Sequence, residues 1–127
     1  MKITAILFVD TVEPCLKFWV DALGFTKTVE VPDGDRLGFV MLNHGGAEVM
    51  LQTHRSAHAD VGDAAGYADG LKCSLFVEVE DFDDVVRRTA AFPVILPIRE
   101  TFYGMQEILL QEPGGHYVCL AARIAKP

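Results

Sequence analysis

The sequence of 127 residues is short of basic side chains and contains no long apolar run. Lysine and arginine together number 11 against 18 aspartates and glutamates, which gives a formal net charge of −7 at pH 7. Proteins that bind nucleic acid without regard to sequence use basic residues to displace counterions from phosphates, so we expect no nucleic-acid partner. No apolar stretch approaches the roughly 20 residues that span a bilayer, so we also expect no membrane partner.

Cysteine is scarce as well. Cys15, Cys73 and Cys119 are the three cysteines, and no two of them have C-x-x-C spacing. An odd number without paired spacing argues against a disulfide framework or a zinc knuckle and suits a reducing compartment. The apolar run at residues 3–9 ends at Asp10 with no small-residue cleavage site after it, so we interpret it as a strand rather than a signal peptide. We therefore expect a cytoplasmic protein.

The residues that are present suit one folded domain. Half of them are hydrophobic and 23% are charged, which is the composition of a chain that can bury a core. Because 127 residues is an ordinary length for a single domain, we expect one domain over residues 1–127.

The first part of the chain predicts a strand, a helix and three more strands. Apolar side chains recur at helical spacing between Val12 and Leu23. The hydroxyl of Thr11 can cap this helix at its start, and Gly24 can end it. Runs of β-branched and aromatic residues separated by turn residues predict the strands. We expect these strands over residues 2–9, 25–31, 37–42 and 47–53.

The same order of elements returns in the second part of the chain. Asp81 can cap a second helix, which Phe92-Pro93 ends because proline disfavours helical geometry in the residue before it. The pairs Gly45-Gly46 and Gly114-Gly115 occupy equivalent places, each just before the last strand of its unit. We expect the second set of strands over residues 73–79, 94–98, 105–111 and 116–122.

The repeat predicts an α+β fold of two βαβββ modules that form a curved mixed sheet around a concave cleft. Module one covers residues 2–53 and module two covers residues 72–123. Residues 54–71 are rich in Ala, Gly, Asp and His without apolar periodicity, and we interpret them as a linker. Each module exposes one apolar sheet face that it cannot bury alone, so the two modules are expected to pack together.

Seven short motifs extend over almost the whole chain: Phe8-Val9-Asp10-Thr11, Phe18-Trp19, Leu23-Gly24-Phe25, Ala47-Glu48-Val49-Met50-Leu51-Gln52, Val79-Glu80-Asp81-Phe82-Asp83, Phe102-Tyr103-Gly104 and Glu112-Pro113-Gly114-Gly115-His116. In this order and spacing they make the sequence resemble the vicinal oxygen chelate superfamily, which includes glyoxalases, bleomycin resistance proteins and extradiol dioxygenases. The fold hosts many chemistries, so the resemblance implies the architecture and leaves the function to the site.

In metal-dependent members of that superfamily an ion is held by His, Gln or Glu side chains at four inward strand positions. The resemblance places these positions on Thr4, Met50, Ser74 and Cys119. Hydroxyls and a thioether are poor ligands for Zn, Ni, Mn or Fe(II), and one thiol cannot hold such an ion alone. We therefore expect no metal and no other cofactor.

A displaced metal site remains an alternative. It would use Glu48 and Gln52, which share the face of Met50 by strand alternation, with Glu78, which shares the face of Ser74, and Cys119. The plainer interpretation makes Glu48 and Glu78 solvated or rim carboxylates and Cys119 a small buried side chain. His116 falls on the face opposite Cys119, Trp19 belongs to the core, and the other histidines are interpreted as loop residues: His44, His54 and His58.

The resemblance implies that inward strand positions and one loop line a cavity with aromatic rings, hydroxyls and carboxylates. The predicted ligand-binding residues are Thr4, Phe8, Glu48, Met50, Gln52, Ser74, Phe76, Tyr103, Tyr117 and Cys119, and no residue is predicted to be catalytic. Our hypothesis is a metal-independent protein of the bleomycin-resistance type that binds a cationic or aromatic small molecule, as a homodimer. One alternative is a lyase, isomerase or dioxygenase-like enzyme of the same fold with a displaced or absent metal site, and its metal-free variant would use Glu48 or Glu78 as general base. Another is an assembly module. The inward side chains are alternatively interpreted as plain core filling.

Overall fold

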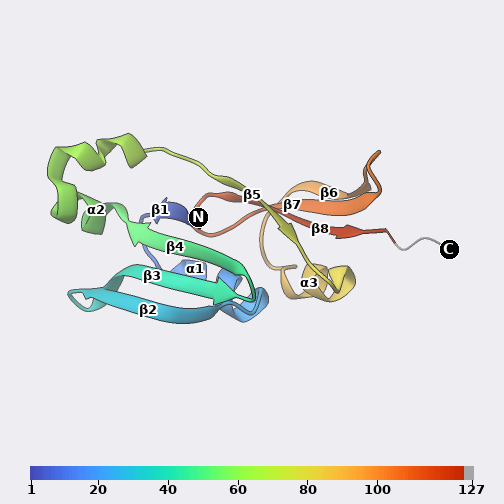
Figure 1. Ribbon diagram of the computed structural model, residues 1–127, viewed down its shortest axis with the longest axis horizontal. Helices are drawn as coiled ribbons and strands as arrows, with labels where there is room; N and C mark the ends of the chain where they lie inside the picture. Colours follow the sequence, from blue (N-terminus) through green and yellow to red (C-terminus); the bar gives the residue numbers. More distant parts are fainter. Residues whose placement is uncertain (125–127) are drawn as a thin grey trace.

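A computed structural model describes residues 1–124 and shows two modules lying side by side, each with its own four-stranded sheet (Figure 1). In the first sheet the strand order is β1-β4-β3-β2, with β1 parallel to β4 and the other neighbours antiparallel. Its elements are β1 (Ala5–Val9), α1 (Glu13–Leu16), η1 (Lys17–Ala22), β2 (Thr26–Asp33), β3 (Arg36–His44) and β4 (Ala47–Thr53).

The second module repeats this topology. Its strand order is β5-β8-β7-β6, again with the first strand parallel to the last and the other pairs antiparallel. Its elements are β5 (Ser74–Glu78), α3 (Phe82–Arg88), β6 (Val94–Glu100), β7 (Met105–Gln111) and β8 (Tyr117–Arg123). The α+β class and the βαβββ repeat are thus confirmed, although the two sheets are not hydrogen-bonded into one.

The two predicted helix caps have different outcomes. The carboxylate of Asp81 accepts the backbone N–H of Asp84 at 3.2 Å, so the predicted cap of α3 is confirmed. Thr11 was expected to cap the first helix and does not, because Val12 occupies the capping position with helical backbone angles and no side-chain bond. The helix then widens into the π-helical turn η1, where the N–H of Leu23 reaches the carbonyl of Phe18 at 3.0 Å.

The segment between the modules, interpreted from its sequence as a linker without apolar periodicity, is helical. It forms α2 (His54–Val61) and the 3-10 helix η2 (Gly62–Ala68). The hydroxyl of Thr53 caps α2 by accepting the N–H of Ser56 at 3.0 Å. The buried face of both helices consists of three alanines that pack on Phe8: Ala57, Ala65 and Ala68. Because alanine is small, these residues give no pattern of large apolar side chains in the sequence.

One continuous core joins the two modules. The helices α1, η1 and α3 pack against one face of each sheet, and buried residues from both modules form a single cluster. Trp19 lies in this cluster without solvent exposure, so its predicted place in the core is confirmed. In β4, Val49 and Leu51 point into the core while Met50 is on the other face. Among the described residues no helix combines the length and apolar character of a membrane crossing.

A buried hydrogen-bond network ties the modules together. Trp19 Nε1 donates to the Glu112 carboxylate at 3.2 Å, and the backbone N–H of His116 donates to the same carboxylate at 2.9 Å. His116 Nδ1 accepts the N–H of Cys73 at 2.9 Å, while Nε2 lies 2.8 Å from the carbonyl of Phe8 and donates to it. The imidazole, which is 1% exposed, is therefore neutral and bridges the first strand of module one to module two.

Candidate functional site

Each sheet has one face that the core helices do not cover, and we call it the free face. In the first sheet, strand pairing aligns Met50 with Ile6 and Met41, and Glu48 with Asn43. Because successive side chains alternate across a strand, these residues share the free face with Gln52. The Glu48 hydrogen bond to Thr4 places Thr4 beside them.

The Glu48 carboxylate is fully engaged by its neighbours. It accepts hydrogen bonds from Thr4 Oγ1 at 2.6 Å, Asn43 Nδ2 at 2.8 Å and Lys2 Nζ at 3.0 Å. These three donors, Thr4 first, lower the pKa of Glu48 from 4.5 to about 2. Such a carboxylate is a weak base at neutral pH and has little capacity to bind a further cation.

We expect the variant Glu48→Gln to depend less on pH in acid than the wild type. A carboxyl group whose pKa falls on folding stabilises the fold fully above its unfolded-state pKa, and that stabilisation is lost as the pH falls from 4.5 toward about 2. Urea unfolding monitored by circular dichroism at a series of acidic pH values measures the slope. Glu100→Gln, on the exposed strand β6, is the control and should keep the wild-type slope. Equal slopes for Glu48→Gln and the wild type would contradict the assignment.

The other end of the first free face is covered. Phe8 is 7% exposed beneath α2 and η2, where the ring of Tyr67 meets it edge-on at a centroid distance of 5.7 Å. Gln52 Nε2 lies 3.2 Å from the hydroxyl of Ser56 in α2. Phe8 and Gln52 were predicted to line a cavity, and the structure instead places them under the segment between the modules.

The free face of the second sheet is more open. Strand pairing aligns Phe76 with Cys119, Cys119 with Leu109 and Leu109 with Leu96, so these four form an apolar row across the sheet. Phe76 is 54% exposed and Leu96 is 48% exposed. Ser74 and Tyr117 are paired in the row beside them, so four predicted site residues share this face.

Glu107 lies at the centre of this face and was missed in the sequence analysis. Its carboxylate is buried, lies 3.3 Å from Arg99 Nη2 and accepts a hydrogen bond from the Tyr103 hydroxyl. That hydrogen bond raises the pKa of Tyr103. A cleft of about 160 Å³ opens beside Glu107 and is lined by Leu96, Pro97, Arg99, Glu107, Leu109 and Cys119. Strand alternation in residues 105–111 could have placed Glu107 beside Leu109, but its contacts depend on Tyr103 and Arg99.

The thiols of the core and of this face are held in their neutral form. Burial, followed by the nearby Glu107 carboxylate, raises the pKa of Cys119 to about 11. Burial and the nearby Glu112 carboxylate raise the pKa of Cys15 to about 12. Since the thiolate is the reactive form, neither cysteine is an activated nucleophile.

The four positions equivalent to metal ligands are divided between the two free faces. Thr4 and Met50 lie on the first sheet, while Ser74 and Cys119 lie on the second. In residues 1–124 no three His, Cys, Asp or Glu side chains converge in a way that could hold a metal ion. The displaced site of Glu48, Gln52, Glu78 and Cys119 is likewise not brought together.

The histidines of the segment between the modules are not in a loop. His54 and His58 are one helical turn apart in α2, so they share a face of the helix. His54 Nδ1 and His58 Nε2 each lie 3.6 Å from Asp69 Oδ1, just beyond η2. These contacts connect the end of the segment to its beginning.

The topology and the free faces place the protein in one structural class. Proteins of this class have a duplicated βαβββ fold, and here the candidate polar side chains lie on the open faces of the sheets rather than at helix ends. The chain belongs to the Glyoxalase/Bleomycin resistance protein/Dioxygenase superfamily, whose family model matches residues 3–120. The family resemblance seen in the sequence is thereby confirmed. No curated protein matches the sequence.

Solved structures share the fold at low sequence identity. TioX from Micromonospora sp. ML1 is 18% identical with a TM-score of 0.77, over 98% of this chain and 99% of its own. Lactoylglutathione lyase from Agrobacterium tumefaciens is 17% identical with a TM-score of 0.75, over 96% of this chain and 92% of its own. The bleomycin-binding protein of Streptomyces verticillus, complexed with copper(II)-bleomycin, is 22% identical with a TM-score of 0.58, over 99% and 97%. At these identities the similarity establishes the fold.

Proposed function

We propose that the protein binds a small aromatic molecule on the free face of the second sheet, without a metal, and sequesters it rather than transforming it. The arrangement around Glu107 carries this proposal. A buried carboxylate with two polar neighbours, Arg99 and Tyr103, lies beside an exposed apolar row that contains Phe76. A few convergent polar groups within an apolar surface are the usual composition of a small-molecule site.

Metal independence is supported by the chemistry of the side chains. Thr4, Met50 and Ser74 offer two hydroxyls and a thioether where metal-dependent relatives need nitrogen or carboxylate ligands. Cys119 offers one thiol, and burial favours the protonated form of that thiol.

The charges on this face favour an aromatic ligand over a strongly cationic one. The negative charge of Glu107 is already matched by Arg99 at 3.3 Å, and the carboxylate of Glu48 on the other sheet is occupied by three donors. Ring stacking on Phe76 and burial against Leu96 would then supply most of the affinity, while Tyr103 and Glu107 orient the ligand.

The low pKa of Glu48 also bears on the alternative that the protein is an enzyme. A general base works best when its pKa lies near the operating pH, and the pKa of Glu48 is about 2. Glu78, the other carboxylate considered for this role, is exposed to solvent. Neither observation favours a lyase, an isomerase or a dioxygenase.

We expect an aromatic ligand to raise the melting temperature of the wild type and to lose this effect in Phe76→Ala. A ligand at 100 times its dissociation constant stabilises a fold by about 2.7 kcal/mol, which is roughly 5–15 °C for a domain of this size. Copper(II)-bleomycin, the ligand in the Streptomyces verticillus structure, is the first probe, followed by a panel of uncharged aromatic compounds. Differential scanning fluorimetry measures the shift.

Two further measurements make this test decisive. Val31→Ala removes a similarly exposed apolar side chain from the first sheet and should keep the full shift. Elemental analysis of protein purified without chelator should find no stoichiometric transition metal. One equivalent of metal, a shift that survives Phe76→Ala, or turnover of a bound compound would each contradict the proposal.

We also propose that a second copy of the chain completes the site. The cleft beside Glu107, at about 160 Å³, is smaller than the ~300 Å³ of an ordinary small-molecule site. Phe76 and Leu96 beside it, and Ile6 on the other free face, are 41–54% exposed. Two of the four edge strands, β2 and β6, contain Pro32 and Pro97, which blunt pairing along these two edges, so we expect the second copy to cover the faces.

The expected result in light scattering is a species of twice the chain mass of 14.0 kDa at micromolar concentration. Phe76→Asp, which puts a charge on the expected contact surface, should shift this equilibrium toward the monomer. Val31→Asp on the edge strand β2 is the control and should stay dimeric. A wild type that scatters as a single 14.0 kDa chain would contradict the dimer.

We place the protein in the cytoplasm. Cys15, Cys73 and Cys119 are all free, and Cys15 is fully buried. Unpaired cysteines suit a reducing compartment, which is the support for this location.

A further inference from the structure

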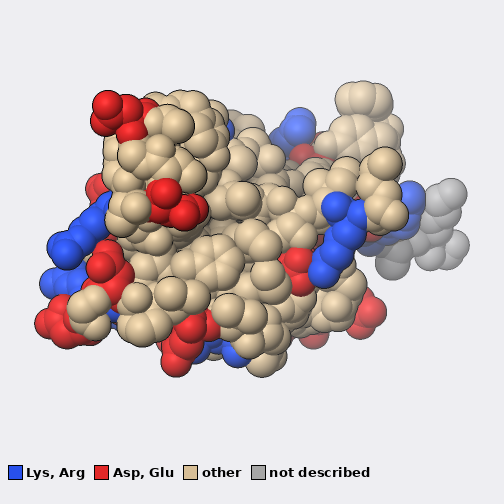
Figure 2. Space-filling view, turned by 60° about the vertical axis from the view of Figure 1, so that its left-hand side comes forward, with Lys and Arg blue, Asp and Glu red and all other residues tan. Residues whose placement is uncertain are grey.

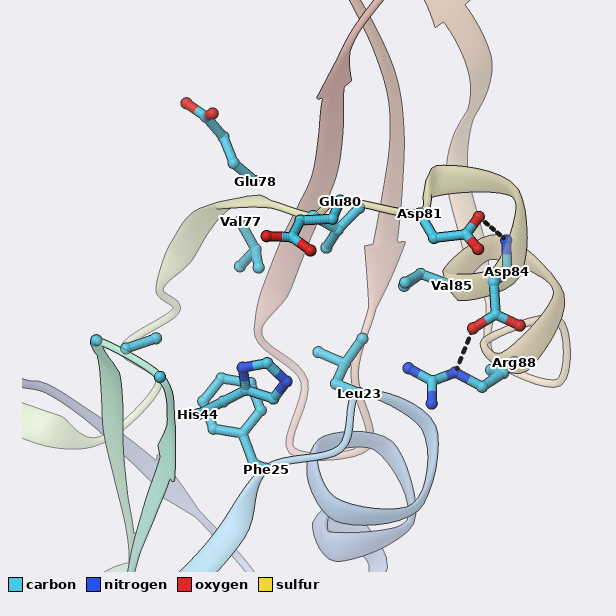
Figure 3. A pocket seen from close by; sticks show the side chains of 14 residues that line it. Leu23, Phe25, His44, Val77, Glu78, Glu80, Asp81, Asp84, Val85 and Arg88 are labelled. Atoms are coloured by element: carbon cyan, nitrogen blue, oxygen red, sulfur yellow. Dashed lines mark hydrogen bonds and ion pairs between the residues drawn. The ribbon is translucent and has the colours of Figure 1, made fainter.

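A second cleft lies between the two modules, with the turn that joins β3 to β4 on one side and the chain from the end of β5 into α3 on the other (Figure 3). Its volume is about 560 Å³, within the ~300–1,000 Å³ range of small-molecule sites. It shares no residue with the cleft beside Glu107, so its ligand need not be the one proposed above.

The floor of this intermodule cleft is apolar, and its side chains are held in place by the core. Leu23, Phe25 and Val85 are 6–7% exposed, so their side chains are anchored in the core and present one side to the cleft. The imidazole of His44 packs against Phe25 at a centroid distance of 5.4 Å and extends this wall toward the turn. A hydrocarbon or aromatic group bound here would remove water from its own surface and from the apolar floor of the cleft.

The rim is acidic. Four carboxylates and one guanidinium border the cleft: Glu78, Glu80, Asp81, Asp84 and Arg88. Asp81 is used in capping α3, and Asp84 is paired with Arg88 at 3.5 Å and with Arg87.

Glu78 and Glu80 differ from these two, because neither has a hydrogen-bond or ion-pair partner within residues 1–124. Figure 3 shows the Glu80 carboxylate over the floor on the side of His44, whereas Glu78 extends outward at the edge. Of these two carboxylates, Glu80 is therefore the one that faces a ligand lying on the floor.

We propose that the intermodule cleft binds a small amphiphilic amine, with its apolar body on Leu23, Phe25 and Val85 and its ammonium group beside Glu80. Charge complementarity selects the ligand class, since Arg88, the one Lys or Arg side chain among the described residues that line the cleft, is already paired with Asp84. A neutral analogue keeps the apolar contact and loses the ion pair, and an anionic analogue adds repulsion from the carboxylates.

The test uses three compounds with one aromatic body: phenethylamine, phenethyl alcohol and hydrocinnamate. Titration of the full-length protein monitored by two-dimensional amide NMR reports both the affinity and the place of binding. The amine should bind most tightly and shift the amides of residues 44–47 and 77–85. Its affinity should fall on adding salt, because the ion pair is exposed to solvent.

Two single variants with the same change of net charge separate a local contact from the overall field. Glu80→Gln removes the proposed partner and should weaken the amine by about fivefold while sparing the alcohol. Glu100→Gln, at the far end of β6, should leave both affinities within about twofold.

Several results would overturn the proposal: no binding of the amine, equal affinity for amine and alcohol, or equal weakening by both variants. Amide shifts confined to the free face of the second sheet would also overturn it. That last outcome would support the site beside Glu107 instead. If no aromatic compound binds the free face of the second sheet in the wild type while the amine still binds in the intermodule cleft, the proposed function is rejected and this inference is kept.

Discussion

The variant His116→Ala is expected to lower the free energy of unfolding by about 3–5 kcal/mol, equivalent to roughly 10–20 °C in melting temperature. The imidazole is 1% exposed and fills space at the junction of the modules. Its loss leaves a cavity and strips the N–H of Cys73 and the carbonyl of Phe8 of their partners. Chemical denaturation followed by circular dichroism measures the change.

His58→Ala is the matched control for this variant. His58 lies on α2 at the surface, with 42% of its side chain exposed, and its one charged neighbour is Asp69 at 3.6 Å. We expect His58→Ala to lower the free energy of unfolding by less than about 1 kcal/mol. If His116→Ala cost no more than His58→Ala, the buried bridge between the modules would not hold them together.

The second large effect is expected at Trp19. Trp19→Ala removes a fully buried ring and the donor to the Glu112 carboxylate, for a loss of about 3–5 kcal/mol. Glu112 is itself 2% exposed and would keep the backbone N–H of His116 as a donor after the indole N–H is lost. The incompletely paired buried carboxylate adds to the loss of stability that the cavity causes.

Trp19→Phe separates the two contributions. It keeps most of the ring contacts with Phe18 and Phe25 but lacks the indole N–H that donates to Glu112. We expect an intermediate loss of about 1–3 kcal/mol, which should shrink in the background of Glu112→Gln because the neutral amide is less costly to leave with an unused acceptor. Additive losses for Trp19→Phe and Glu112→Gln would show that the hydrogen bond contributes nothing.

The two proposed ligand sites lie on surfaces that differ in charge. On the face in Figure 2, uncharged areas lie between separate groups of acidic and basic side chains. The open row of the second sheet is apolar, whereas the rim of the intermodule cleft carries acidic side chains. The two proposed sites therefore differ in the interaction that would select their ligands, which is ring stacking in one and charge in the other.

The sequence by itself determined the repeat and most of its elements. Strands 47–53 and 105–111 have the predicted bounds, and the Asp81 cap is where its side chain indicated. These features depend on local chemistry, namely alternation of side chains, turn residues and a carboxylate near free N–H groups. The burial of Trp19 follows from its place on the apolar stripe of one helix.

Only the tertiary structure decided which residues meet. Glu48 was a candidate base until Thr4, Asn43 and Lys2 were seen to bind its carboxylate. Glu107 became a candidate site residue only because Tyr103 and Arg99 converge on it. Such contacts join different strands and loops, and a pattern along one strand carries no information about them.

The segment between the modules was misjudged for a related reason. Alanines produce little apolar periodicity, so residues 54–68 gave no helical signal, yet small side chains are what allow α2 and η2 to pack closely on Phe8. His116 likewise offered no sign of bridging two modules, because its partners Phe8 and Cys73 come from distant parts of the chain. Local propensity therefore specified each module, and long-range packing specified their junction and the surfaces available to ligands.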